Sequence, residues 1–175
     1  MAKPSFRPRI VQKKLNGLFP RLTAFEAIPG GDESQVFRFD SEGQAFILRL
    51  NPSVHNFKKD AFVHNRFARP ELPIPEVIGL GDFEDCFYCI SRRLPGRTLQ
   101  DLEPEELSAL LVPTCGVWHA IAKSHLKEMS GFGPFDHKGA ATCQTWRAFL
   151  TGVLDPAKHD WKGLRVRTKV DGLEG

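Results

Sequence analysis

The sequence predicts an α+β fold in which a small antiparallel sheet and one helix are followed by a helical region. Three observations support this prediction: a β-hairpin signature over residues 30–51, a second pair of strand-like runs over residues 77–91, and a change from strand-like to helical composition after Pro95–Gly96. The hairpin is the strongest signal, so the sheet is expected to form the centre of the fold.

The N-terminal region is predicted to form a short amphipathic helix and a first strand. Apolar residues recur at helical spacing over about residues 9–19, until Pro20 ends the run. They are Ile10, Val11, Leu15, Leu18 and Phe19. Residues Leu22–Ile28 then favour a strand that leads into Gly30–Gly31. We expect the helix to cap the sheet.

The hairpin signature consists of two alternating runs, Val36–Phe39 and Ala45–Leu50, around the turn-forming residues Asp40–Gly43. Side chains alternate across a strand, so the second run has two different faces. One face carries Phe46, Leu48 and Leu50, and the other carries Ile47 and Arg49. An arginine among apolar residues needs a counter-charge or a solvated site.

The glycine pair before the hairpin favours either an anion-binding loop or a simple turn. Without a Cβ, the backbone of Gly30–Gly31 can approach an anion closely, and a cation on the second strand, Arg49, can meet phosphates beneath such a loop. Two glycines before a strand are also common in ordinary turns. The residues alone leave both interpretations open.

A helix and a second strand pair are predicted beyond Pro52. The helix covers residues 57–68 and has an apolar face made of Phe57, Ala61, Val63 or His64, and Phe67. Three prolines, Pro70, Pro73 and Pro75, end it and hold the chain extended, because a residue before proline is pushed out of the α region. The strand pair Val77–Phe83 and Cys86–Ser91 follows, with a turn at Glu84–Asp85.

The composition becomes helical after Pro95–Gly96, which predicts a first domain over residues 1–95 and a second over residues 96–161. A long apolar stripe, with Pro113 as its expected kink, carries Leu107, Leu110, Leu111, Val117, Trp118 and Ile121. We expect an aromatic loop at Gly131–Phe135 and a further helix from Trp146 that stops near Asp155–Pro156. Residues 162–175 lack periodicity and are predicted to be an irregular tail.

Bulk properties exclude several classes of function. The 24 basic and 21 acidic residues leave a net charge of +3, which is too small to indicate nucleic-acid binding. The basic residues that gather at both ends are interpreted as solvated surface. No apolar run approaches the roughly 20 residues of a membrane-spanning helix, and the first residues lack a signal-peptide core.

The four cysteines do not suggest a metal site. Cys86 and Cys89 resemble a C-x-x-C motif, but residues three apart in a strand point to opposite faces and cannot chelate one zinc ion. His119 and His125 are six apart, which turns them to different faces of a helix. We interpret the cysteines as reduced and mostly buried, which favours a cytoplasmic protein.

Four runs are distinctive: Leu72–Val77, Tyr88–Arg93, Thr98–Leu102 and Ser130–Phe135. They resemble runs of the aminoglycoside phosphotransferases, which have a protein-kinase-like fold, and in particular of their hygromycin B-type members. The resemblance extends to about Trp161. It implies a kinase-like small lobe followed by the first helices of the large lobe. It also implies that the chain corresponds to only the N-terminal part of a family member.

The resemblance implies a role for each residue that matches the family pattern. Gly30, Gly31 and Ser34 match the loop over the ATP phosphates, and Val36 and Ile47 match the apolar residues that enclose adenine.

Arg49 matches the strand lysine that meets the α- and β-phosphates, and Asp60 matches the helix glutamate that pairs with that lysine. A longer cation facing a shorter carboxylate spans a similar gap, although an ordinary ion pair is the alternative. Arg92 and Leu94 match the hinge, where the Arg92 carbonyl and the Leu94 N–H would bond the adenine edge.

The sequence lacks the catalytic part of such an enzyme. Members of this family place the catalytic base and the Mg²⁺ ligand on an H-x-D-x-x-x-x-N loop and a later Asp, and neither occurs here. Asp136–His137 and His159–Asp160 have the wrong spacing. We therefore assign no catalytic or metal-binding residue to this chain. We expect this chain to bind ATP. The ligands for Mg²⁺ and most of the aminoglycoside pocket are expected in the missing lobe.

Three functional hypotheses follow. The first is a truncated aminoglycoside phosphotransferase that is inactive by itself. The second is a nucleotide-binding remnant or split-protein half that docks a large-lobe partner through Trp118, Trp146 and Phe149. The third is a poorly folded fragment, because a small lobe buries surface against its large lobe.

Overall fold

The computed structural model describes residues 3–126 and 129–155. By their contacts, the residues divide into two compact units, one ending at His125 and one beginning at Leu126. The predicted lobe boundary at Pro95–Gly96 lies within the first unit, so the assignment of residues 96–161 to a second lobe stays a prediction. The predicted tail, residues 162–175, lies outside the described part of the chain.

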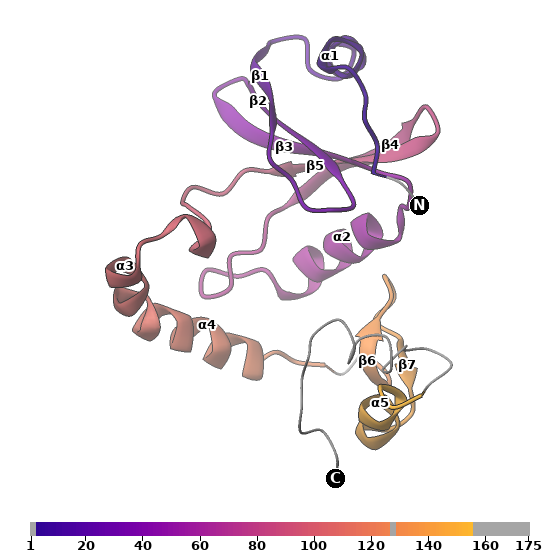
Figure 1. Ribbon diagram of the computed structural model, residues 1–175, viewed down its shortest axis with the longest axis vertical. Helices are drawn as coiled ribbons and strands as arrows, with labels where there is room; N and C mark the ends of the chain where they lie inside the picture. The colour runs from indigo at the N-terminus through magenta and orange to yellow at the C-terminus, as the bar shows by residue number, and fades with distance from the viewer. Residues whose placement is uncertain (1–2, 127–128, 156–175) are drawn as a thin grey trace, which may run out of the picture. The chain divides into compact units, whose positions relative to one another are not determined.

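The first unit is built on a five-stranded antiparallel sheet with the strand order β1-β2-β3-β5-β4. The strands are β1 (Leu22–Ile28), β2 (Gln35–Ser41), β3 (Gln44–Asn51), β4 (Val77–Phe83) and β5 (Cys86–Arg92). Helix α1 (Pro8–Leu15) covers one face of the sheet, and α2 (His55–Phe67) lies along the other (Figure 1). This architecture confirms the predicted α+β class and the expectation that the first helix caps the sheet.

Both predicted hairpins are present, and their turns are tight. Glu42 and Gly43 connect β2 to β3 with positive φ angles of 52° and 76°, which gives a turn whose twist matches that of the flanking strands. Pairs such as Phe37 with Leu48 and Arg38 with Ile47 fix the register of this hairpin. Glu84, with φ of 52°, begins the corresponding turn between β4 and β5.

The main core lies between the sheet and α1. Its buried residues are Val11, Leu15, Phe37, Phe39, Phe46, Leu48, Leu50, Phe83, Cys86 and Ile90. Phe19 packs edge-on against Phe39, with ring centroids 5.0 Å apart. The predicted division of β3 into two faces is confirmed, because Ile47 and Arg49 are absent from this core and are only half-buried.

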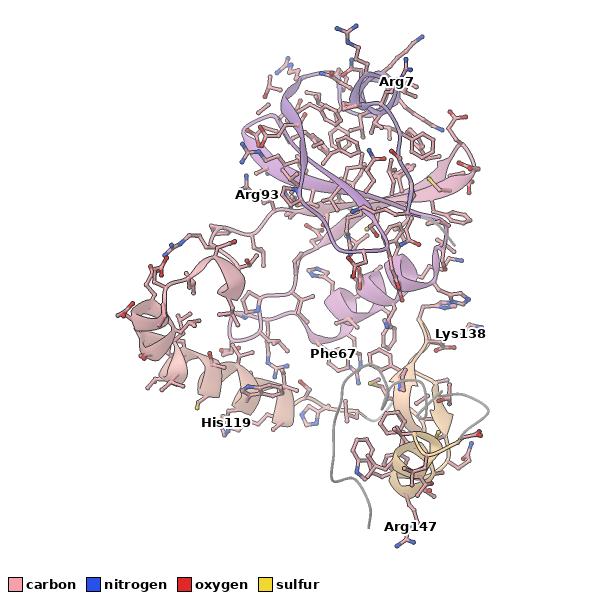
Figure 2. The ribbon with its side chains drawn as sticks, viewed as in Figure 1. Arg7, Phe67, Arg93, His119, Lys138 and Arg147 are labelled. Carbon is pink, nitrogen blue, oxygen red and sulfur yellow. The ribbon has the colours of Figure 1, made fainter. Side chains whose placement is uncertain are left out.

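Helix α1 ends earlier than predicted. The periodic pattern placed its end near Phe19, but the helix stops at Leu15. The Gly17 N–H bonds the Lys14 carbonyl, which tightens the chain into a turn. Glycine disfavours a helix interior by about 1 kcal/mol relative to alanine, so Gly17 favours termination there. Arg7, just before the helix, is exposed and projects away from the sheet (Figure 2).

The predicted kinked helix is instead two helices, α3 (Pro104–Ala109) and α4 (Leu111–Ala122), which follow a short 3₁₀ turn, η1 (Leu99–Asp101). The break falls at Leu110, so the prediction of a kink at Pro113 is wrong. Pro113 lies in the first turn of α4, where its missing N–H removes no intrahelical hydrogen bond.

The second unit contains a two-stranded sheet of β6 (Phe132–Phe135) and β7 (Ala141–Cys143) and the helix α5 (Trp146–Gly152). The predicted aromatic loop is therefore wrong, because Phe132 and Phe135 pair with residues of β7. The predicted helix from Trp146 is confirmed. Among the described residues, no helix has both the length and the apolar character needed to cross a membrane.

Replacing the buried Leu48 by alanine should destabilise the first unit strongly. Leu48 lies in the core between β3 and α1, so Leu48→Ala should lower the free energy of unfolding by about 2–5 kcal/mol. Leu18→Ala is the matched control, since Leu18 is exposed and should change stability by no more than about 0.5 kcal/mol. Urea denaturation followed by circular dichroism measures both, and equal losses would contradict the assigned core.

Candidate functional site

The sheet face opposite the main core carries the candidate site, which centres on Arg49 of β3 and Asp60 of α2. The Arg49 Nη2 atom donates a hydrogen bond to the Asp60 Oδ2 atom at 2.7 Å. The two side chains are 30% and 38% exposed. The structure thus brings together the two charged residues that the sequence singled out.

Other groups hold the Arg49 guanidinium in place. It lies over the Phe57 ring of α2, 5.1 Å from the centroid, and its Nη2 atom is 3.4 Å from the Cys89 Sγ atom of β5. Burial by itself lowers the pKa of Arg49, but the neighbouring Cys89 and Asp60 outweigh burial and raise the pKa above its usual value. Arg49 therefore keeps its positive charge at this half-buried position.

Cys89 contacts the site as a neutral thiol. It is fully buried, and burial raises its pKa, while the nearby Arg49 only partly opposes that rise. Cys86 lies on the other face of β5 in the main core, which confirms that these two cysteines face apart. The prediction that the cysteines are mostly buried is wrong for the other two, because Cys115 is exposed on α4 and Cys143 is only half-buried.

A cavity of about 250 Å³ lies beside the ion pair. Its lining residues come from three strands, from α2 and from the proline segment before β4: Arg49, Asp60, Val63, Ile74, Pro75, Val77 and Ser91. The Ile74 carbonyl lies 2.8 Å from the Nδ1 atom of His64, which ties the proline segment to α2. The cavity therefore has one charged side and largely apolar walls, a combination found in small-molecule sites.

The glycine loop, residues 30–34, runs directly into β2. A Cβ on Gly30 would lie 2.4 Å from the Val36 Cγ2 atom, so only glycine permits this close approach, whereas a Cβ on Gly31 would meet open space. The Ser34 hydroxyl accepts a hydrogen bond from the Asn51 Nδ2 atom at 3.0 Å.

The strand register places the apolar candidates next to the ion pair. Val36 lies opposite Arg49 in the β2–β3 pair, and Ile47 lies opposite Ser91 in the β3–β5 pair. These two apolar side chains therefore occupy the same sheet face as Arg49, although neither lines the cavity.

The last two candidates, Arg92 and Leu94, lie at the end of β5. The Arg92 Nε atom donates to the Glu76 Oε2 atom at 2.7 Å, and the Arg92 N–H donates to the Glu76 carbonyl at 2.9 Å. The Leu94 N–H has no protein acceptor within residues 3–126 and 129–155. Figure 2 shows Arg93, the residue between them, where the chain leaves the sheet.

Sequence reasoning missed two residues of this site, Asn51 and Ser91. Asn51 ends β3 and bonds the glycine loop, and Ser91 lines the cavity. A polar residue at the end of an apolar strand, followed by Pro52, was the available signal for Asn51.

The described residues include no group of three or more acidic, histidine or cysteine side chains that would hold a metal ion. Asp136 is engaged in its own turn, where its Oδ1 atom accepts hydrogen bonds from the Lys138 and Ala140 N–H groups and its pKa is lowered. His159–Asp160 lies outside the described residues.

The chain is similar to a curated kinase over most of its length. No family model matches it. It is 41% identical over 163 residues to Hygromycin-B 4-O-kinase of Escherichia coli, in a match that covers 93% of this chain and 48% of that protein. The chain therefore spans about half the length of this relative.

Solved structures give the same result. The crystal structure of aminoglycoside phosphotransferase APH(4)-Ia matches with a TM-score of 0.83 and 40% identity, over 90% of this chain and 53% of the other. A thermostable mutant of that protein, in a ternary complex with AMP-PNP and hygromycin B, matches with a TM-score of 0.81 and 42% identity, over 87% of this chain and 52% of the other. These matches confirm the resemblance to the aminoglycoside phosphotransferases and the kinase-like fold.

The cysteines should differ in reactivity in a way that tests the site geometry. Cys89 is buried against Arg49 with a raised pKa, so little of it is thiolate at pH 8, and iodoacetamide should leave it unmodified in the folded protein. Cys115 is exposed and should be alkylated first. Peptide mass spectrometry measures both, with urea-unfolded protein as the control. Alkylation of Cys89 as fast as Cys115 would contradict the buried site.

Proposed function

We propose that this chain is the nucleotide-binding part of a cytoplasmic, ATP-dependent O-phosphotransferase that acts on aminoglycosides of the hygromycin B type. The observation that carries the proposal is the Arg49–Asp60 ion pair beside the cavity, in a chain 41% identical to a hygromycin B kinase. The nucleotide complexes of APH(4)-Ia support ATP as the ligand class.

Within this proposal, the phosphates of ATP lie under the glycine loop. The backbone of Gly30 and Gly31 and the hydroxyl of Ser34 face the phosphate oxygens, and Arg49, oriented by Asp60, binds the α- and β-phosphates. A guanidinium donates through several N–H groups, so it can hold Asp60 and a phosphate at once.

The adenine ring would occupy the sheet face beside these groups. Val36 and Ile47 would enclose the ring, and the Arg92 carbonyl and the Leu94 N–H would bond its edge. Within the described part of the chain the Leu94 N–H has no protein acceptor, which supports this assignment, because a hinge donor must be open to the base.

The transfer step needs groups that this sequence does not supply. In the full reaction a drug hydroxyl oxygen bonds the γ-phosphorus, the bond from that phosphorus to the ADP oxygen breaks, and a base takes the hydroxyl proton. Among the described residues, no group of three or more acidic, histidine or cysteine side chains could hold a metal ion. We assign the base, the Mg²⁺ ligands and most of the drug pocket to the remaining half of a full-length protein, with residues 1–95 as the nucleotide lobe and residues 96–161 as the start of the second lobe.

A second candidate is a split-protein half that functions only with a separate large-lobe partner. The exposed apolar side chains of α4 favour it: Leu111 is 68% exposed and Trp118, seven positions later on the same helix face, is 67% exposed. An apolar helix face of this kind is typical of an interaction site.

Replacing Arg49 should weaken nucleotide binding. Arg49→Ala removes the cation expected at the phosphates, so its Kd for ATP should rise at least about tenfold, equivalent to about 1.4 kcal/mol. Arg97→Ala is the matched control, because Arg97 also pairs with a carboxylate, that of Glu106, but lies away from the cavity. Isothermal titration calorimetry measures both. An unchanged Kd for Arg49→Ala would refute the proposed phosphate role.

The purified 175-residue chain should release no ADP in response to hygromycin B, because its sequence has no H-x-D-x-x-x-x-N loop. A coupled ADP assay, with a Gly30→Ala variant as the background, measures this. Adding the large-lobe half of APH(4)-Ia as a separate polypeptide should restore activity if the split-protein candidate holds. Drug-dependent turnover by the chain alone, above the variant, would overturn the assignment of catalysis to the missing half.

A further inference from the structure

We infer that Asn51 is a positioning residue that fixes the glycine loop relative to the helix carrying Asp60. This inference rests on the proposed function, because it concerns how the nucleotide site is held in shape. It adds a residue to that site which the sequence motifs did not indicate.

The Asn51 carboxamide makes three hydrogen bonds to two separate segments. Its Nδ2 atom donates to the Glu33 carbonyl at 3.1 Å and to the Ser34 hydroxyl at 3.0 Å, both in the glycine loop. Its Oδ1 atom accepts from the Ser53 N–H at 2.8 Å, in the connection to α2. Asn51 is only 6% exposed, so solvent cannot readily replace these bonds.

The second segment leads directly into α2. The Ser53 hydroxyl accepts a hydrogen bond from the N–H of His55, the first residue of the helix, at 3.3 Å. Asn51 also follows Arg49 by two positions in β3, which places both side chains on the same sheet face. One side chain therefore joins the loop, the strand of Arg49 and the helix of Asp60.

Only a carboxamide of this size supplies this pattern. Two N–H donors serve the loop, and one carbonyl serves the helix connection. Aspartate at position 51 would keep the acceptor for Ser53 but would present no donor to the Glu33 carbonyl. Because Asn51 already donates to Ser34, the Ser34 hydroxyl proton stays available for a phosphate oxygen.

The test combines limited proteolysis with nucleotide binding. A glutamate-specific protease cleaves after Glu33 in the loop, and Glu42 and Glu84, in the two hairpin turns, serve as internal controls. Asn51→Ala should raise cleavage after Glu33 roughly tenfold and leave cleavage at the hairpin turns unchanged. The Kd for a fluorescent N-methylanthraniloyl ATP should rise about fivefold to tenfold.

Two further variants sharpen the test. Asn51→Asp keeps the bond to Ser53, so it should fold while loosening the loop and weakening nucleotide binding, which covers the case in which Asn51→Ala does not fold. Asp136→Ala is the matched control, because it also removes two side-chain bonds to a loop backbone, in the second unit, and should change neither Glu33 cleavage nor nucleotide affinity.

The outcomes are distinguishable. Faster cleavage after all three glutamates would show that Asn51 has a purely structural role and would overturn the inference. Faster cleavage after Glu33 with an unchanged Kd for the nucleotide would overturn it as well. If the wild-type chain binds no nucleotide, the proposed function fails, and unchanged cleavage after Glu33 in the Asn51 variants would then overturn the inference separately. Selective cleavage together with weaker binding supports it.

Discussion

The two-sided character of strand β3 is the constraint on which the rest of the structure depends. Its even-numbered side chains from Phe46 to Leu50 fill the core beneath α1, and this burial fixes the register of the strand. The intervening positions must then face α2. Because a shift by one residue would expose the core side chains and bury Arg49 among the phenylalanines, folding of the apolar core also sets the position of the charged site.

Arg49 is stable on that face because its surroundings match its chemistry. The Asp60 carboxylate supplies the counter-charge, the Phe57 ring covers one face of the guanidinium, and the Cys89 sulfur accepts a weak hydrogen bond. An ammonium group would be more strongly hydrated and less suited to stacking on a ring. The combination of a long planar cation with a short carboxylate is therefore consistent within this site, although it departs from the lysine–glutamate pair implied by the family pattern.

The local periodicity of the sequence was sufficient to predict the sheet and the position of Arg49. It did not predict contacts between residues that are far apart in the sequence. Alternation predicts the two faces of a strand, and the family pattern identified Asp60. The strand at Phe132–Phe135 is defined by pairing with β7, and the sequence pattern of one short segment does not reveal such a partner. Asn51 was missed for the same reason, since its hydrogen-bond acceptors in the glycine loop lie 17 and 18 positions earlier in the chain.

The exposed apolar side chains of α4 lie outside the core that positions the candidate site. The buried core residues come from α1 and from strands β2 to β5, and none of them lies in α4, so the face that carries Arg49 and Asp60 does not need α4 to define it. Burying apolar surface contributes about 25 cal/mol per Å², and Val112 and Trp118 leave such surface in contact with water. The chain spans about half the length of the curated relative that it matches. A further segment can therefore cover the apolar side chains of α4 without any change to the core that positions Arg49 and Asp60.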